Sequence, residues 1–170
     1  VFARAGIGKS AFLVHVALTN ALRGTPVLHI SLTDGHARVR SMYDEILTEV
    51  ANAARATDIA RFQVEIERNR QIHSNLDGDF GTAELSSLLE TLATIMHFRP
   101  TVVMIDGMDA ATFSSGAWRE LAKDLSLRLW FSVRTHRTGE TDTDVLAQQF
   151  DTAVQLSPKG ADIALVVLRV

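Results

Sequence analysis

The sequence predicts a three-layer α/β/α fold whose mostly parallel sheet ends in an antiparallel hairpin. Short, nearly continuous apolar runs, which are typical of strands buried on both faces, occur at 27–32, 101–106 and 127–133. Segments with apolar residues at three- and four-residue spacing, which indicate amphipathic helices, occur at 36–55 and 85–96. Strands that alternate with helices favour βαβ crossovers and therefore a parallel sheet.

The first third of the chain predicts a strand, a buried helix, a second strand and a second helix. Only two residues precede a glycine-rich loop that begins at Ala3, so we expect a truncated first strand, because strands usually have about five residues. Residues 11–22 are apolar all round and are followed by Gly24, which predicts a buried helix that stops there. The strand at 27–32 and the helix at 36–55 then follow.

The rest of the chain predicts shorter elements. The charged segment 59–72 is predicted to be helical, and 73–81, rich in Asn, Asp and Gly, to be a loop. The helix at 85–96 ends before Pro100, and the strand at 101–106 follows. The remaining elements are a short helix, a strand, one or two helical turns and two edge strands joined by a turn, at 118–125, 127–133, 144–150, 152–156 and 163–170.

Length and composition limit the classes of protein. The 170 residues with 46% hydrophobic content fit one domain over 1–170, expected to be incomplete at both ends. The net charge of -3 disfavours strong electrostatic binding of DNA. The absence of cysteine and of any apolar run of about 18 residues favours a cytoplasmic protein without a membrane span. The six histidines show no metal-ligand spacing.

The segment Ala3-Arg4-Ala5-Gly6-Ile7-Gly8-Lys9-Ser10 carries most of the functional information. It reads as a phosphate-binding P-loop, or Walker A motif, in which backbone amides surround phosphates, Lys9 reaches the terminal phosphates and Ser10 holds Mg²⁺. The segment departs from the common pattern of this motif at Ala3, where glycine is commoner. Alanine fits there if that residue avoids positive φ. The expected ligand is a magnesium nucleotide, with these cofactor-binding residues: Ala5, Gly6, Ile7, Gly8, Lys9, Ser10 and Ala11.

Asp106 closes the most strand-like segment of the chain. A carboxylate at the carboxyl end of a strand is where an open α/β sheet binds ligands and where a P-loop protein holds Mg²⁺, so we assign Asp106 the Walker B role beside Ser10. The alternative is an ordinary strand-end residue that starts a turn with Gly107, since Asp-Gly is a common turn pair. The P-loop upstream favours the metal role.

These landmarks together resemble the RecA/KaiC-like ATPases. The resemblance rests on the P-loop, on the strand from Val102 to Asp106, and, less specifically, on the strand and the residues at 27–34, the strand at 129–132 and the terminal hairpin. It covers nearly the whole chain. It implies a RecA-type core that hydrolyses ATP at subunit interfaces of a homo-oligomeric ring or filament.

The resemblance also assigns further residues. KaiC-like members commonly have a pair of glutamates after the second strand, one of which activates water, whereas this chain has Thr33 and Asp34. Asp34 is therefore the candidate base, with a helix-start or turn role as its alternative; Asp109 is a weaker substitute. Ser132 occupies the position of a polar sensor beside the γ-phosphate, or is a buried serine satisfied by the backbone. A basic cluster follows, either sensing nucleotide or solvated: Arg134, His136 and Arg137.

The sequence therefore predicts an ATPase in which Lys9 and Asp34 are catalytic and ATP and Mg²⁺ are bound. The second hypothesis is a nucleotide-binding switch or assembly module that scarcely hydrolyses ATP, which the Thr33-Asp34 pair favours. A DNA recombination or helicase core ranks lower, because residues 107–116 contain no Lys or Arg to neutralise phosphates. The absence of a guanine-reading motif favours ATP over GTP. No sequence feature marks the acceptor pocket of a small-molecule kinase.

Overall fold

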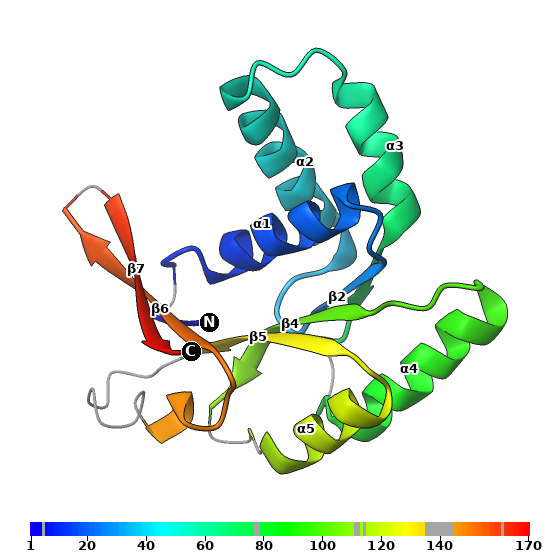
Figure 1. The fold of residues 1–170 in the computed structure, drawn as a ribbon, viewed down its shortest axis with the longest axis vertical. Helices are drawn as coiled ribbons and strands as arrows, with labels where there is room; N and C mark the ends of the chain where they lie inside the picture. Colours follow the sequence, from blue (N-terminus) through cyan, green and yellow to red (C-terminus); the bar gives the residue numbers. More distant parts are fainter. Residues whose placement is uncertain (5, 77–78, 111–112, 114, 135–144, 161) are drawn as a thin grey trace.

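The computed structural model describes residues 1–4, 6–76, 79–110, 113, 115–134, 145–160 and 162–170 (Figure 1). Its elements are, in chain order, β1 (Phe2–Ala3), α1 (Lys9–Leu22), β2 (Val27–Ser31), α2 (His36–Ala53), α3 (Ile59–Asn69), β3 (Arg70–Ser74), α4 (Thr82–Ile95), β4 (Val102–Asp109), α5 (Ser115–Asp124), β5 (Arg128–Arg134), β6 (Ala153–Lys159) and β7 (Asp162–Arg169). Residues 145–147 form one helical turn.

The strands form one seven-stranded sheet in the order β3-β2-β4-β5-β1-β6-β7. All neighbouring pairs are parallel except β6 and β7, which form the antiparallel hairpin that the sequence predicts. β1 lies between β5 and β6, so the chain must pass over β5 and β4 to reach β2, and α1 makes this crossover. β1 has only two residues.

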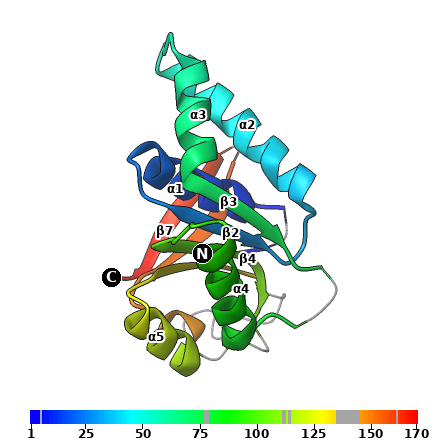
Figure 2. The same cartoon turned by 90° about the vertical axis from the view of Figure 1, so that its right-hand side faces the viewer.

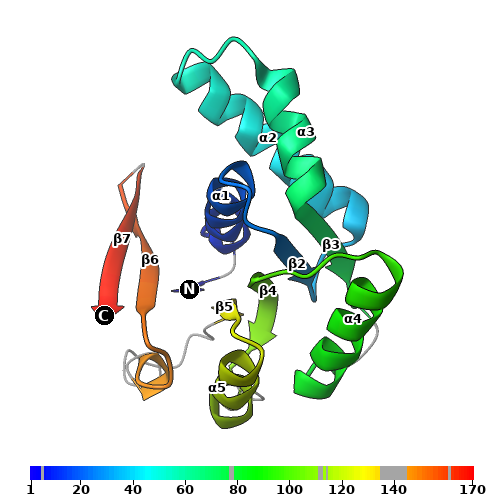
Figure 3. The ribbon, with the colours of Figure 1, turned by 45° about the vertical axis from the view of Figure 1, so that its right-hand side comes forward.

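Helices cover both faces of the sheet, as the predicted three-layer fold requires. α1, α2 and α3 lie on one face, and α4 and α5 lie on the other (Figures 1 and 3). The strand residues alternate accordingly: in β4, Val102 and Met104 belong to the core on the α1 side, and Val103 and Ile105 belong to the core on the α4 and α5 side. α2 and α3 run side by side and extend beyond the sheet (Figure 2).

The sequence predictions for residues 59–81 are partly wrong. The helix predicted at 59–72 ends at Asn69, and Arg70–Ser74 form β3, which pairs in parallel with β2 at the sheet edge. The side-chain amide of Asn69 donates to the carbonyl of Ala21 on α1, 3.2 Å away, and to that of Glu65, 3.0 Å away, and so ties the end of α3 to α1. Without a glycine or proline between helix and strand, the sequence pattern does not mark the change. The loop predicted at 73–81 accordingly begins later, after Ser74.

The strand predicted to end at Asp106 instead continues to Asp109. Its pairing with β5 shifts between Asp106 and Met108, so Gly107 forms a β-bulge. The helical turn predicted at 144–150 is present at 145–147, while Asp144 lies outside the described residues.

Candidate functional site

The loop after β1 owes its shape to two glycines. Gly6 and Gly8 have φ of 79° and 80°, in the left-handed region that other residues seldom adopt. Ala3, by contrast, lies in β1 and is not among the described non-glycine residues with positive φ. This explains why alanine suffices at a position where such loops more often have glycine, and it agrees with the sequence prediction. Ala5 lies outside the described residues.

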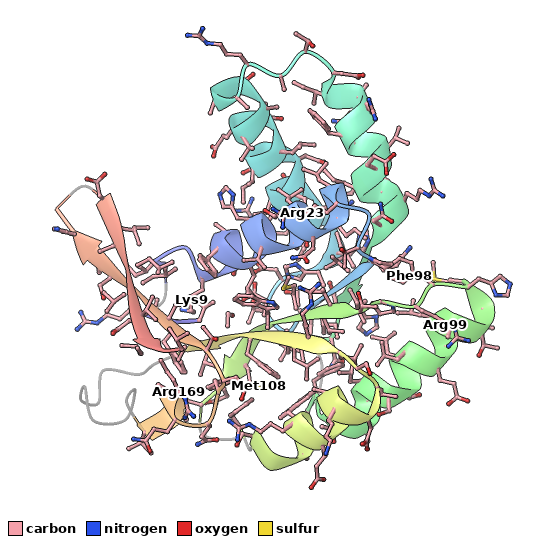
Figure 4. All side chains as sticks on the ribbon, in the orientation of Figure 1. Lys9, Arg23, Phe98, Arg99, Met108 and Arg169 are labelled. Atoms are coloured by element: carbon pink, nitrogen blue, oxygen red, sulfur yellow. The ribbon has the colours of Figure 1, made fainter. Side chains whose placement is uncertain are left out.

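Lys9 begins α1 and is held inside this loop. Its Nζ donates to the carbonyl oxygens of Ala3, at 2.8 Å, and Arg4, at 3.0 Å, and the residue is only 8% exposed. The loop therefore folds around the ammonium group, which lies between the start of α1 and the sheet (Figure 4). A charged donor that is already desolvated and directed by the backbone is suited to bind an anion.

The start of α1 adds backbone donors at the same place. The amide of Phe12 donates to the carbonyl of Gly8, 2.9 Å away, and begins the helical hydrogen-bond ladder. The amides of the preceding helix residues, including Ser10 and Ala11, belong to the first turn, where an α-helix supplies no internal acceptor. This is the arrangement that binds phosphate at helix N-termini. Ile7 and Ser10 are half-buried, and Gly6 is exposed.

Asp106 and Ser132 form the second half of the site. They are paired across β4 and β5, and both are buried, at 3% and 0% exposure. The Ser132 hydroxyl donates to Oδ1 of Asp106 and accepts from the amide of Gly107, 2.8 Å away. Ser132 thus fixes the orientation of the Asp106 carboxylate and links it to the bulge. The sequence analysis placed Ser132 in the site but did not predict its hydrogen bond to Asp106. The signal that would indicate this bond is the pairing of the two residues between β4 and β5.

Gly107 is constrained from two sides. Its φ is 97°, and a Cβ on this residue would lie 2.5 Å from Cγ2 of Thr33, at the end of β2. Only glycine fits here without displacing Thr33. The Asp106-Gly107 pair therefore forms a bulge within β4, and the alternative interpretation as a strand-ending turn is wrong.

The residues after β2 are arranged around Ser31, which is paired with Asp106 in the sheet. The Ser31 Oγ accepts from the amide of Asp34 at 2.9 Å, and the Thr33 hydroxyl donates to Oδ2 of Asp34 at 3.3 Å. The N-cap of α2 is Gly35, without a side-chain capping bond, so Asp34 is not the helix cap. Asp34 is half-buried beside the sheet edge where β2 and β4 end.

The strand register brings these parts to one edge of the sheet. Phe2 of β1 is paired with Val133, the residue after Ser132, so the loop begins one strand away from Ser132 and two from Asp106. The side chain of Asp106 shares the α1 face with Met104, because alternate strand residues point to the same side. The exposed Asp109 is paired with Arg134, whose side chain is not among those described, and His136 and Arg137 lie outside the described residues.

A buried polar cluster lies on the same face, behind Asp106. Nδ1 of His29 and the hydroxyl of Tyr43 are 2.9 Å apart, and the Arg70 guanidinium lies 4.5 Å from the centre of the Tyr43 ring. Burial lowers the pKa of His29 to about 4, although the charge of Asp106 opposes this shift. Burial also raises the pKa of Tyr43. His29 is therefore neutral at physiological pH. Nε2 of His29 has no hydrogen-bond partner among the described residues.

Two further observations concern the described part of the chain. Its helices include none that is long and apolar enough to cross a membrane. Its His, Asp and Glu side chains include no group of three that could hold a metal ion by themselves.

Comparison with known proteins supports the fold. No family model matches the sequence, and no curated protein matches it. A solved structure described as an ATPase domain matches with a TM-score of 0.66 and 17% sequence identity, over 99% of this chain and 75% of that chain. Likeness at this level of identity shows the fold alone. The molecule therefore has the RecA-like P-loop fold, with a mostly parallel sheet and a C-terminal hairpin.

Proposed function

We propose that this protein binds ATP with Mg²⁺ at the loop between β1 and α1 and hydrolyses it, as a RecA/KaiC-like ATPase domain spanning residues 1–170. The observation that carries the proposal is the buried Asp106 carboxylate, which Ser132 holds in position. The strand register brings this carboxylate and the loop that contains Lys9 to the same edge of the sheet. We further propose that the nucleotide state controls assembly of a homo-oligomeric ring or filament, or binding of a protein partner.

The residues present fit a magnesium nucleotide. Lys9 is held by two neutral carbonyl oxygens, and phosphate oxygens form stronger, charge-assisted bonds with an ammonium group. The positive φ of Gly6 and Gly8 and the first-turn amides of α1 provide backbone donors for the same phosphates. The Ser10 hydroxyl and the Asp106 carboxylate are oxygen ligands of the type that Mg²⁺ prefers, directly or through its water shell. Bound Mg²⁺ would neutralise charge on the phosphates.

Asp34 is the residue that we propose to orient the attacking water. It follows the strand paired with β4, and its amide is fixed to Ser31. A carboxylate is an effective base in phosphoryl transfer only when it is held in position, so this anchoring favours the role. The side chain of aspartate is one methylene shorter than that of glutamate, and we therefore expect slow turnover.

The proposal is tested by replacing Lys9. We expect Lys9→Ala to weaken ATP binding by about 10- to 100-fold and turnover by at least about 100-fold, because a buried charged donor is lost. Isothermal titration and a phosphate-release assay measure the two effects. Lys123→Ala, which removes an exposed lysine from the last turn of α5, is the matched control. Unchanged ATP affinity and turnover in Lys9→Ala would refute the proposal.

A nucleotide-binding switch with little hydrolysis is the second candidate. It is favoured because a threonine, which cannot act as a general base, stands at position 33, and because the side chain of Asp34 is one methylene shorter than that of glutamate. Turnover of the wild-type protein and of Asp34→Asn distinguishes the two candidates. Strong hydrolysis that disappears in Asp34→Asn, but not in the exposed control Asp44→Asn, excludes the switch. Tight ATP binding with turnover that is negligible in both supports it.

A further inference from the structure

Residues 32–35, which we call the β2–α2 loop, are connected to β4 by hydrogen bonding and by packing. β2 and β4 lie side by side in the sheet (Figure 3). The amide of Leu32 donates to the carbonyl of Asp106, 2.9 Å away, and so extends the contact between the two strands one residue beyond β2. The loop that carries Asp34 therefore begins on the residue whose carboxylate Ser132 holds.

Ser31, the last residue of β2, fixes the backbone of the β2–α2 loop. Its side chain is buried, and its Oγ accepts from the amides of Thr33, 3.4 Å away, and of Asp34, 2.9 Å away. A hydroxyl oxygen has two lone pairs, and the loop uses both of them. These two bonds close a tight turn. The turn therefore sets the direction of the Thr33 side chain.

The side chain of Thr33 packs against the bulge in β4. A Cβ at Gly107 would lie 2.5 Å from Cγ2 of Thr33 and 3.4 Å from its Oγ1, so the methyl group is the part of the side chain nearest to the glycine. The amide of Gly107 donates to the Ser132 hydroxyl, which donates to Asp106. The methyl group of Thr33 thus meets the peptide unit that is linked to the candidate metal-binding carboxylate.

We propose that Thr33 is a positioning residue of the candidate site, whose methyl group, packed on Gly107, fixes Asp34 relative to Asp106. This inference rests on the proposed ATP hydrolysis. In phosphoryl transfer, a carboxylate that orients water acts only at a defined position relative to the phosphate and its metal ion. A loop that is anchored on the metal-binding strand sets that position. Thr33 acts here through packing, since its side chain cannot serve as a base.

The test separates the methyl group of Thr33 from its hydroxyl group. Thr33→Ser removes the methyl group, and we expect kcat for ATP to fall by about tenfold while ATP affinity stays within about twofold, because contacts with the bound nucleotide are untouched. Thr33→Val keeps a methyl group at the bulge and should retain kcat within about threefold of wild type. Thr91→Ser, at an exposed position of α4, is the matched control. Phosphate release and isothermal titration give the two quantities, and thermal melting checks that each variant is folded.

A second measurement needs neither nucleotide nor turnover. The amide of Asp34 is bonded to Ser31, so its hydrogen exchange, followed by NMR in the nucleotide-free protein, reports how firmly the β2–α2 loop is held. We expect exchange at least about threefold faster in Thr33→Ser than in wild type, because one methyl contact is lost, and near the wild-type rate in Thr33→Val. The amide of Met104, inside β4, is the internal reference.

The other outcomes overturn the inference. Either an unchanged kcat or an unchanged exchange rate in folded Thr33→Ser does so, and so do equal losses in the two variants. Loss of kcat in Thr33→Val alone would assign the positioning to the hydroxyl group, which donates to Oδ2 of Asp34 at 3.3 Å. If wild-type protein binds or hydrolyses no ATP, the proposed function itself fails, and the exchange rates still decide whether Thr33 holds the loop.

Discussion

The loop after β1 and the ends of β4 and β5 contribute to one candidate site but hold their polar groups by different means. The loop uses the backbone: Gly6 and Gly8 set its path, and carbonyl oxygens hold Lys9. The strand ends use side chains: the Ser132 hydroxyl joins the Asp106 carboxylate to the amide of the bulge. Apart from Gly6, Gly8 and Lys9, the residues of the loop should therefore tolerate substitution better than the residues at the strand ends do. Four predictions test this contrast: the first concerns activity, and the other three concern stability, from the largest expected effect to the smallest.

At the strand ends, substitution of Ser132 should impair the use of Mg²⁺. We expect Ser132→Ala to raise the Mg²⁺ concentration needed for half-maximal ATP turnover by about 10- to 100-fold, because Asp106 loses the partner that orients it. A magnesium titration of phosphate release measures this, with Ser87→Ala, at an exposed position of α4, as control. A lower kcat with unchanged magnesium dependence would instead favour the role of phosphate sensor for Ser132.

A substitution at the bulge should have the largest effect on stability. We expect Gly107→Ala to lower the free energy of unfolding by about 3 to 4 kcal/mol, because the new Cβ meets Thr33 and the residue keeps a positive φ. Denaturant unfolding measures the loss. The atom in conflict is Cγ2 of Thr33, so the double variant with Thr33→Ser should recover part of the stability. No recovery would show that the backbone conformation alone sets the cost.

The buried cluster behind Asp106 predicts a pH dependence. The pKa of His29 is lowered by burial from 6.5 to about 4, so between these values the unfolded chain binds a proton that the folded chain does not. Stability is therefore fully present above about pH 6.5 and falls by on the order of 3 kcal/mol as pH falls to about 4. Unfolding measured at a series of pH values should show a shallower acid decline in His29→Gln than in wild type. Parallel declines would contradict a buried neutral histidine.

The smallest effect is expected in the loop, at Ala3. Ala3 lies in β1 and has no positive φ, so its backbone conformation does not require glycine. Ala3→Gly should lower the free energy of unfolding by about 0.5 to 1 kcal/mol, because glycine loses more conformational entropy on folding. ATP affinity should not change. A clear gain in affinity on titration would show that the alanine restricts the loop.

The sequence predicts the fold well where the pattern is strong, and it fails where tertiary contacts decide. Continuous apolar runs identify β2, β4 and β5, because strands covered on both faces need apolar side chains throughout. β3 is missed because it is a short, polar edge strand whose start is set by contact with α1 and pairing with β2. Its residues have little local preference of their own.

The candidate site likewise contains residues that the sequence predicts and contacts that it does not predict. The residues of the loop are evident from their spacing, since a Gly-Lys-Ser sequence at the start of a helix has one usual use. The contacts of Ser132 with Asp106 and Gly107 depend on the register of two strands and join residues 26 and 25 positions apart, which no local pattern encodes. The cluster of His29, Tyr43 and Arg70 joins three elements and is likewise absent from the sequence pattern.

The contact between Thr33 and Gly107 has an evolutionary consequence. The two residues share one small volume, because the methyl group of Thr33 occupies the place of a Cβ at position 107. A side chain at 107 is compatible only with a smaller residue at 33, and a β-branched residue at 33 is compatible only with glycine at 107. In related sequences a β-branched residue at position 33 should therefore be accompanied by glycine at position 107, even though the two positions are far apart along the chain.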